Sequence, residues 1–269
     1  LVIIDTMGDR SPDAELHRIG GQGVFVKDVQ AAVLDGRADI AVHSAKDLPA
    51  TTPDGLVIGA FPERADARDA LVGRALADIT TGGRVATGSV RRRAQLANVR
   101  PDLTFAPLRG NIETRLRKAA GFDAIVVAFA ALERLGLTDR VAEVLEPSVI
   151  VPQVAQGALA VECRAGDAVV RERLGAIDDA DVRRTVTAER AFLEALGGGC
   201  DLPCGAYATT DGVDVTLLAA LATLDGHVVV RTKVRGSDPD ATGRAAAERL
   251  LDREGGRGLL DLEDVGAPQ

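Results

Sequence analysis

One stretch of the chain decides the fold: Arg84-Val85-Ala86-Thr87-Gly88-Ser89-Val90-Arg91-Arg92-Arg93. Its first residues, Arg84–Thr87, have the character of a short strand, and Val90–Val99 has the pattern of a helix. Gly88 permits a tight turn between them, and Ser89 is a good N-cap for the helix. A strand that passes through a glycine turn into a helix is typical of α/β proteins with largely parallel sheets.

The same alternation extends to both sides of this stretch. The predicted strands are Val2–Ile4, Ile40–His43, Leu56–Ala60, Arg84–Thr87, Leu103–Pro107 and Ala124–Ala128. The predicted helices are Lys27–Asp35, Val90–Val99, Ile112–Ala120 and Ala130–Leu135. The last third differs, because two strands, Val213–Ala222 and His227–Arg235, pair around an Asp225-Gly226 hairpin signal between helices Arg184–Leu196 and Ala241–Asp252. This order predicts a small antiparallel sheet covered by helices.

Two polar segments predict where the chain passes between domains. Glu63–Asp69 is a turn-rich hinge candidate, and a second crossing near Val151–Gln156 would return the chain. We therefore expect residues 1–64 and 156–178 to form a first α/β lobe and residues 65–155 to form a second. Residues 179–269 are expected to form a separate C-terminal α+β domain with an antiparallel sheet.

Composition excludes several classes of partner. The chain has 269 residues, 46% hydrophobic and 27% charged, with a net charge of −8, which argues against nucleic acid or an anionic membrane as the main partner. No apolar run has the length of a membrane span, and three cysteines suit a reducing cytoplasm. A basic cluster in so acidic a chain should therefore have a local function.

Four basic segments follow predicted strands: His43–Pro49, Thr87–Arg93, Leu108–Arg115 and the region of Arg134. Open α/β sheets bind ligands at the carboxyl ends of their strands. Lys46-Asp47 taken alone is more simply a solvated ion pair. Three arginines in the first turn of a helix oppose its dipole, so we interpret them as an anion site. Dinucleotide and P-loop fingerprints are absent from the sequence, and guanidinium groups match carboxylates, which favours a ligand with many separate carboxylates.

The run Gly197-Gly198-Gly199-Cys200 is the other unusual feature. Three glycines give a flexible backbone that lets a thiol approach a ligand closely. A buried cysteine, half of a metal site and a thiolate nucleophile are alternatives. The sequence offers no recognised set of further metal ligands, and no base follows near Cys200. The residues alone thus indicate an anion-binding α/β protein with a noteworthy thiol, and no metal site is predicted.

Taken together, these segments resemble the porphobilinogen deaminase (hydroxymethylbilane synthase) family. The resemblance is carried by Gly20–Lys27, Val42–Pro49, Glu63–Leu71, Thr87–Leu96, Leu108–Leu116, Asp123–Leu137, Pro152–Arg164 and Thr187–Tyr207. It implies two lobes like those of periplasmic binding proteins, followed by the small C-terminal domain. It also implies a cytoplasmic, monomeric transferase of tetrapyrrole biosynthesis that condenses four porphobilinogen molecules, with loss of ammonia, into hydroxymethylbilane.

The resemblance further implies roles for individual residues. A dipyrromethane cofactor, the primer for the growing oligopyrrole, would be attached through a thioether to Cys200, and Asp47 would be the principal catalytic group. The other residues assigned to the cofactor are Lys46, Ser44, Thr87, Ser89, Arg91, Arg92, Arg109 and Gly110. Those assigned to the substrate are Arg115, Arg134, Phe25 and Gln156.

The chain also departs from the family pattern. Gln22 stands where a Lys or Thr is expected, and Ala155 where a Gly is expected. The family opens with a strand and a helix that carry an Arg and a Ser, whereas this sequence begins at Leu1 within an apolar run, so we expect residues upstream of it. Two other classes of function are alternatives: a non-catalytic two-lobed protein that binds small anions, and a cysteine-dependent hydrolase.

Overall fold

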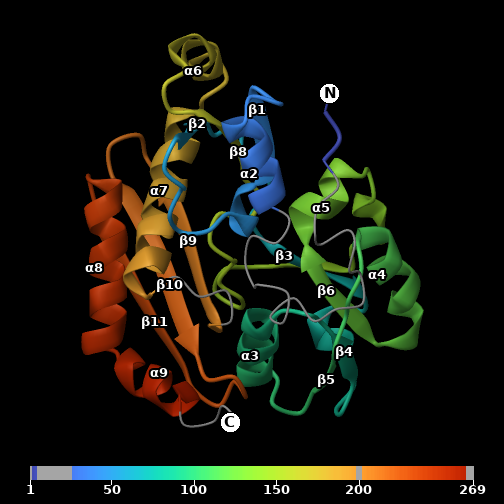
Figure 1. Ribbon diagram of the computed structural model, residues 1–269. Coiled ribbons are helices and arrows are strands. Elements are labelled where there is room, and N and C mark those ends of the chain that lie inside the picture. Colours follow the sequence, from blue (N-terminus) through green and yellow to red (C-terminus); the bar gives the residue numbers. More distant parts are fainter. Residues whose placement is uncertain (1, 5–25, 198–201, 265–269) are drawn as a thin grey trace.

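The described strands form three sheets, each covered by helices (Figure 1). In a computed structural model, residues 2–4, 26–197 and 202–264 are described. The first sheet lies at the top of the view in Figure 1, the second at the right and the third at the left. The predicted mixed α/β fold with a C-terminal antiparallel sheet is confirmed.

The first sheet has the order β1-β8-β2, and its strands pair antiparallel. These are β1 (Ile40–Ser44), β8 (Leu159–Arg164) and β2 (Leu56–Ala60). The expectation of largely parallel pairing is wrong for these described strands, because β8 returns from the second sheet and enters between β1 and β2 in the opposite direction. The adjoining helices are α2 (Lys27–Leu34) and α6 (Ala168–Gly175).

The second sheet has the order β5-β4-β6-β3-β7 and contains the parallel pairs. Its strands are β3 (Asp69–Gly73), β4 (Arg84–Ala86), β5 (Thr104–Ala106), β6 (Ala124–Ala128) and β7 (Glu143–Leu145). β4 pairs parallel with β5 and β6, whereas β3 pairs antiparallel with β6 and β7. Its helices are α3 (Val90–Val99), α4 (Ile112–Lys118) and α5 (Phe129–Arg134). Short 3₁₀ turns lie at Ala45–Asp47, Leu76–Asp78, Ala119–Gly121 and Thr138–Arg140.

The third sheet is an antiparallel meander of β9 (Cys204–Thr210), β10 (Val215–Ala222) and β11 (Val229–Gly236). The predicted hairpin is confirmed, with Ala222 opposite Val229. Helices α7 (Ala180–Ala195) and α8 (Pro239–Asp252) cover the sheet, and α9 (Gly256–Asp264) follows. Phe192 of α7 is fully buried in the cluster beneath.

Some elements differ from the sequence prediction. Residues 2–4 form no strand, and Val2 and Ile3 are 51% and 89% exposed. β3, β7, β8, β9, α6 and α9 were not predicted. β3 begins at Asp69, the last residue of the predicted hinge, β7 has only three residues, and β8 carries Glu162 and Arg164 among its apolar residues. Each of these features weakens the local strand pattern.

Two chain segments cross side by side between the first and second sheets. The backbone N–H of Ala65 donates to the carbonyl of Gly157 at 3.2 Å, and Arg64 Nε donates to the carbonyl of Gln156 at 3.0 Å. Gly157 has φ +86, and a Cβ there would lie 2.3 Å from the Ala65 carbonyl oxygen, so this close approach requires glycine. Ala155 has φ +58, which gives a conformational reason for the glycine expected at that position.

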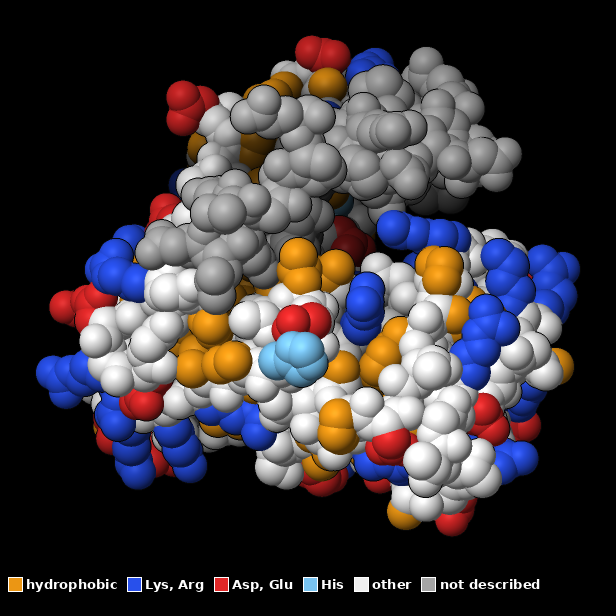
Figure 2. Space-filling model, turned by 90° about the horizontal axis from the view of Figure 1, so that it is seen from below, with side chains coloured by type: hydrophobic (Ala, Val, Ile, Leu, Met, Phe, Trp, Pro, Cys, Tyr) orange, Lys and Arg blue, Asp and Glu red, His pale blue; other side chains and the backbone are white. Residues whose placement is uncertain are grey.

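The face seen from below in Figure 2 carries Lys and Arg side chains mainly toward its sides and upper edge. Acidic side chains lie between them, and the hydrophobic side chains form small separate groups. On this face, the described residues therefore form neither a continuous basic surface nor a broad apolar patch. Among the described residues, no helix is both long enough and apolar enough to span a bilayer.

Candidate functional site

Lys46 and Asp47 lie in the 3₁₀ turn that directly follows β1. The turn is fixed to the returning chain, because the N–H of Ala45 donates to the carbonyl of Ala158 at 3.0 Å. Lys46 is half-buried, and burial, reinforced by repulsion from Arg92, lowers its pKa to about 8. Asp47 is exposed, yet the surrounding protein raises the pKa of its carboxyl through partial desolvation.

Cationic side chains oppose that rise in the pKa of Asp47. Lys46 and Arg115 both favour its ionised form. Arg115 belongs to α4, beside the second sheet, so the Asp47 carboxylate from the first lobe interacts with a cation of the second. The site is therefore assembled from both sheets.

The glycine turn at the start of α3 has the predicted geometry. Ser89 caps the helix, because its Oγ accepts from the N–H of Arg92 at 3.4 Å, and Thr87 Oγ1 accepts from the N–H of Ser89 at 3.2 Å. A Cβ on Gly88 would lie 2.5 Å from the Leu108 carbonyl oxygen. The absence of a side chain at Gly88 thus allows two of the basic segments to lie against each other.

Arg91 and Arg92 share a buried carboxylate that the sequence analysis missed, that of Asp69 in β3. The two arginines are 3% and 5% exposed, and Asp69 is 0% exposed. Arg92 Nε donates to Asp69 Oδ1 at 2.9 Å, and Arg91 Nη2 lies 2.8 Å from Oδ2 without hydrogen-bond alignment. Burial alone would raise the pKa of Asp69, but the two guanidinium groups hold it at about 2. The arginines interpreted only as an anion site therefore also have an internal counterion.

Gln156 completes this buried network. Its Nε2 donates to Asp69 Oδ1 at 2.8 Å and to the Ala67 carbonyl at 2.7 Å, and its Oε1 accepts from Arg92 Nη2 at 3.3 Å. The side chain is fully buried, so the structure gives it a contact with the arginine pair, and its role as a substrate ligand stays a prediction. Arg91 donates through Nη1 to the Val151 carbonyl at 2.7 Å, while its Nε is buried without a hydrogen-bond partner in the described part of the chain.

The remaining predicted arginines differ in position. Arg115 is half-buried and donates through Nε to the Gly110 carbonyl at 2.7 Å; burial, with repulsion from Arg92 and Arg109, lowers its pKa. Gly110 has φ +113, and a Cβ there would meet the Thr114 side chain at 2.7 Å. Arg109 is exposed. Arg134, also exposed, lies at the crossing, where its Nη2 donates to the Gly157 carbonyl at 2.7 Å.

The structure therefore brings one charged cluster together. Four cationic side chains, Lys46, Arg91, Arg92 and Arg115, interact with the carboxylates of Asp47 or Asp69, and a fifth, Arg109, lies close enough to Arg115 to repel it. Ser44 is half-buried one residue before the turn. Phe25 and Cys200 lie outside the described residues, and so does Gln22. Within the described residues, no group of three or more His, Cys, Asp or Glu is placed to hold a metal ion.

An excess of buried and half-buried positive charge is unfavourable unless an anion accompanies it. Fold and site together thus define a class: a two-lobed α/β protein with a cationic site suited to a ligand with several carboxylates, joined to a C-terminal α+β domain.

Comparison with known proteins narrows this class. Residues 1–172 match the family described as "Porphobilinogen deaminase, dipyromethane cofactor binding domain", and residues 183–252 match "Porphobilinogen deaminase, C-terminal domain".

Full-length relatives agree. The porphobilinogen deaminase of Roseiflexus castenholzii is 48% identical over 96% of this chain and 86% of its own length. That of Exiguobacterium sp. is 47% identical over the same shares. A periplasmic binding protein of Salmonella typhimurium matches 55% of this chain and 67% of its own at 15% identity with a TM-score of 0.31, too low for any argument. The chain belongs to the porphobilinogen deaminase family, which favours a transferase over a non-catalytic anion-binding protein.

Proposed function

We propose that Asp47 is the catalytic carboxylate with which this chain, as a hydroxymethylbilane synthase, condenses porphobilinogen. The observation that carries the proposal is the contrast between the two carboxylates of the site. Asp69 is 0% exposed and held by two arginines, whereas Asp47 is exposed at the surface of the same cationic cluster. Only the second can come within reach of a ligand.

The described residues fit a dipyrromethane cofactor. Its acetate and propionate groups need several cations, and the site has five against two carboxylates. Arg91 Nε, buried and unpaired in the described part of the chain, is a donor that a carboxylate could satisfy. Lys46, Arg91, Arg92, Arg109 and Arg115 would hold the cofactor, with Thr87, Ser89 and Gly110 shaping the loops. We propose Cys200 as the attachment point.

Each residue then has a defined part in the reaction. The bound dipyrromethane supplies the pyrrole carbon to which substrate units are joined. When ammonia leaves porphobilinogen, positive charge develops on the substrate's pyrrole, and the Asp47 carboxylate stabilises that charge from a fixed position. Lys46 and Arg115 favour the ionised form of Asp47 and so oppose the desolvation that raises its pKa. The arginines bind and orient the substrate's carboxylates through paired guanidinium contacts.

The test is Asp47→Asn, which removes the charge while preserving shape. We expect turnover to fall by about two to three powers of ten. Asp54→Asn is the matched control, because Asp54 is an exposed carboxylate in the loop between the Asp47 turn and β2. Intact mass and circular dichroism check that each variant keeps its primer and fold. Near-normal turnover in folded, primer-bearing Asp47→Asn would overturn the proposal.

The cellular setting is part of the same proposal. The family assignment and the small number of cysteines support a cytoplasmic enzyme. We propose that it acts as a monomer on porphobilinogen and the growing oligopyrrole. Size-exclusion chromatography with light scattering tests the monomer, since a stable dimer would double the measured mass.

A further inference from the structure

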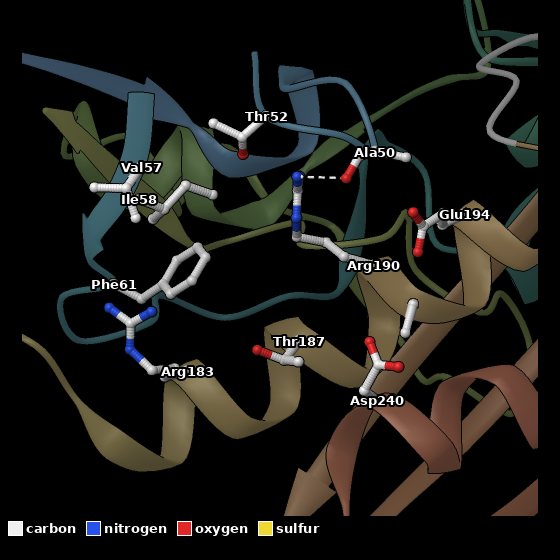
Figure 3. A pocket seen from close by; sticks show the side chains of 11 residues that line it. Ala50, Thr52, Val57, Ile58, Phe61, Arg183, Thr187, Arg190, Glu194 and Asp240 are labelled. Atoms are coloured by element: carbon white, nitrogen blue, oxygen red, sulfur yellow. Dashed lines mark hydrogen bonds between the residues drawn. The ribbon is translucent and has the colours of Figure 1, made fainter. Parts of the chain in front are cut away.

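Arg190 of α7 reaches from the C-terminal domain to the loop that carries Asp47. Its Nη2 donates to the carbonyls of Pro49 and Ala50, each at 2.8 Å. Figure 3 shows the guanidinium group pointing from the helix to the Ala50 carbonyl. These two carbonyls belong to the second and third residues after Asp47, so one side chain fixes the backbone directly beyond the proposed catalytic group.

The loop has few other ties at this point. On its near side, the N–H of Leu48 closes the 3₁₀ turn at 3.3 Å, and Gln153 Nε2 donates to the Lys46 carbonyl at 3.4 Å. Among the described residues, no other hydrogen bond is made by the carbonyls of Pro49 and Ala50. Leu48 is anchored by packing in the hydrophobic core, whereas the backbone carbonyls of the next two residues are fixed by hydrogen bonds from Arg190.

The charge of the same cation is matched by two nearby acids. Arg190 is half-buried, and burial lowers its pKa, while the charges of Glu162 and Glu194 oppose that change. Glu162 in turn lies 3.0 Å from His43 Nε2, in the strand that leads into Asp47. Arg190 is thus hydrogen-bonded to the backbone after the Asp47 turn, and Glu162, whose charge it feels, lies against the strand before that turn.

We propose that Arg190 is a positioning residue for Asp47: from α7 it fixes the position of the Asp47 loop relative to the cationic site. The inference rests on the proposed catalytic role of Asp47. A displacement of about 1 Å in a catalytic group can cost roughly a hundredfold in rate. Loss of Arg190 should therefore lower kcat more than it changes KM, because the arginines that hold substrate lie elsewhere.

The surroundings of Arg190 allow a chemical test. The guanidinium group lines a pocket of about 320 Å³ bordered by Thr52, Phe61, Arg183, Thr187 and Glu194 (Figure 3). Truncation in Arg190→Ala would join the vacated space to this pocket. A guanidinium ion could then enter and donate to the same two carbonyls.

Arg183 supplies the matched control. It lies on the same helix and lines the same pocket, and its Nη2 donates to the Gly59 carbonyl of β2 at 3.1 Å, but it makes no contact with the Asp47 loop. Arg183→Ala thus removes an equal volume and a comparable contact between domains. A purely structural effect would be similar in both variants.

The experiment measures kcat and KM of the full, primer-bearing protein with 0 to a few millimolar guanidinium chloride, well below denaturing concentrations. We expect kcat of Arg190→Ala to fall about a hundredfold with a smaller change in KM, and guanidinium to restore at least tenfold. Arg183→Ala should keep most of its kcat and show no rescue. If Arg190→Ala does not fold, Arg190→Gln, which keeps an N–H donor, replaces it.

Two results would overturn the inference: near-normal kcat in a folded Arg190 variant, or a loss of kcat that matches Arg183→Ala and is not rescued. Asp47→Asn separates this failure from failure of the proposed function. If Asp47→Asn is inactive while Arg190→Ala is normal, only the positioning role fails. If Asp47→Asn is active, the proposed function fails with it.

Discussion

Asp69→Asn is the sharpest test of how the cationic site is held together. The substitution keeps the size of a fully buried side chain but removes the charge shared by Arg91 and Arg92. The difference between the ordinary pKa of 3.8 and about 2 corresponds to about 2 kcal/mol favouring the ionised carboxylate. Leaving two buried guanidinium groups without a counterion adds to this, and removing one partner of a buried ion pair typically costs about 3–5 kcal/mol. We expect a loss of about 3 kcal/mol in the free energy of unfolding.

The assay is urea unfolding followed by far-UV circular dichroism, since the chain has no Trp. The pKa of Asp69 is lowered in the folded protein, so its contribution is present above pH 3.8 and is lost as pH falls toward about 2. The difference between wild type and Asp69→Asn should therefore be full at pH 7 and narrow below pH 4. Asp102→Asn is the control, because Asp102 also makes a paired contact, with Arg100, but is partly exposed. A change of less than about 1 kcal/mol at pH 7 would refute the argument.

Two further predictions concern the ligand. Because Lys46 has a pKa lowered to about 8, its charge is present below that pH and lost above it, and bound carboxylates would move the transition upward. In the wild type, kcat/KM should therefore decrease at or above pH 8. In Lys46→Arg, whose side chain stays charged, this alkaline decrease should be absent. The same decrease in both proteins would exclude Lys46 as its source. Cys200→Ser should give protein without the added mass of two pyrrole units and without turnover. Peptide mapping of the wild type that located the adduct on Cys204 would move the attachment point.

Local signals in the sequence were sufficient for the parts of the fold that local chemistry controls. Ser89 and Gly88 predicted the start of α3, and Asp225-Gly226 predicted the hairpin of the third sheet. The direction of β8 could not be predicted in this way, because it depends on where the chain goes after leaving the second sheet. Residues 2–4 have a strand-like composition, but a strand also needs a neighbouring strand to pair with, and composition cannot show whether one is present.

The site shows the same limit. The sequence drew attention to Lys46, Asp47 and the arginines because each follows a strand, and the structure brings Lys46 and Asp47 together with all but Arg134. Asp69 and Arg190 escaped notice, since their partners lie far along the chain: Arg92 for Asp69, and the carbonyls of Pro49 and Ala50 for Arg190. Pairings of this kind depend on tertiary contacts. The sequence hint of Asp69 was an acid directly before the apolar residues Ala70-Leu71-Val72.

The meeting of Ala65 and Gly157 has a consequence for how such a chain could be assembled or re-engineered. Everything between them, including the whole second sheet, is inserted where the two chain segments cross, and there the Ala65 N–H donates to the Gly157 carbonyl at 3.2 Å and Arg64 Nε donates to the Gln156 carbonyl at 3.0 Å. β1 and β2 precede the inserted segment and β8 follows it. Since β8 pairs with both, the first sheet is completed by strands from before and after the insertion. A short turn could bridge the gap, and the excised segment would have adjacent ends, the arrangement that tolerates transplantation and circular permutation. Transplantation would also have to replace the hydrogen bonds that tie this segment to the third sheet, in which Asn98 Nδ2 donates to the Gly226 carbonyl and Arg231 Nη2 donates to the Val149 carbonyl, each at 3.1 Å.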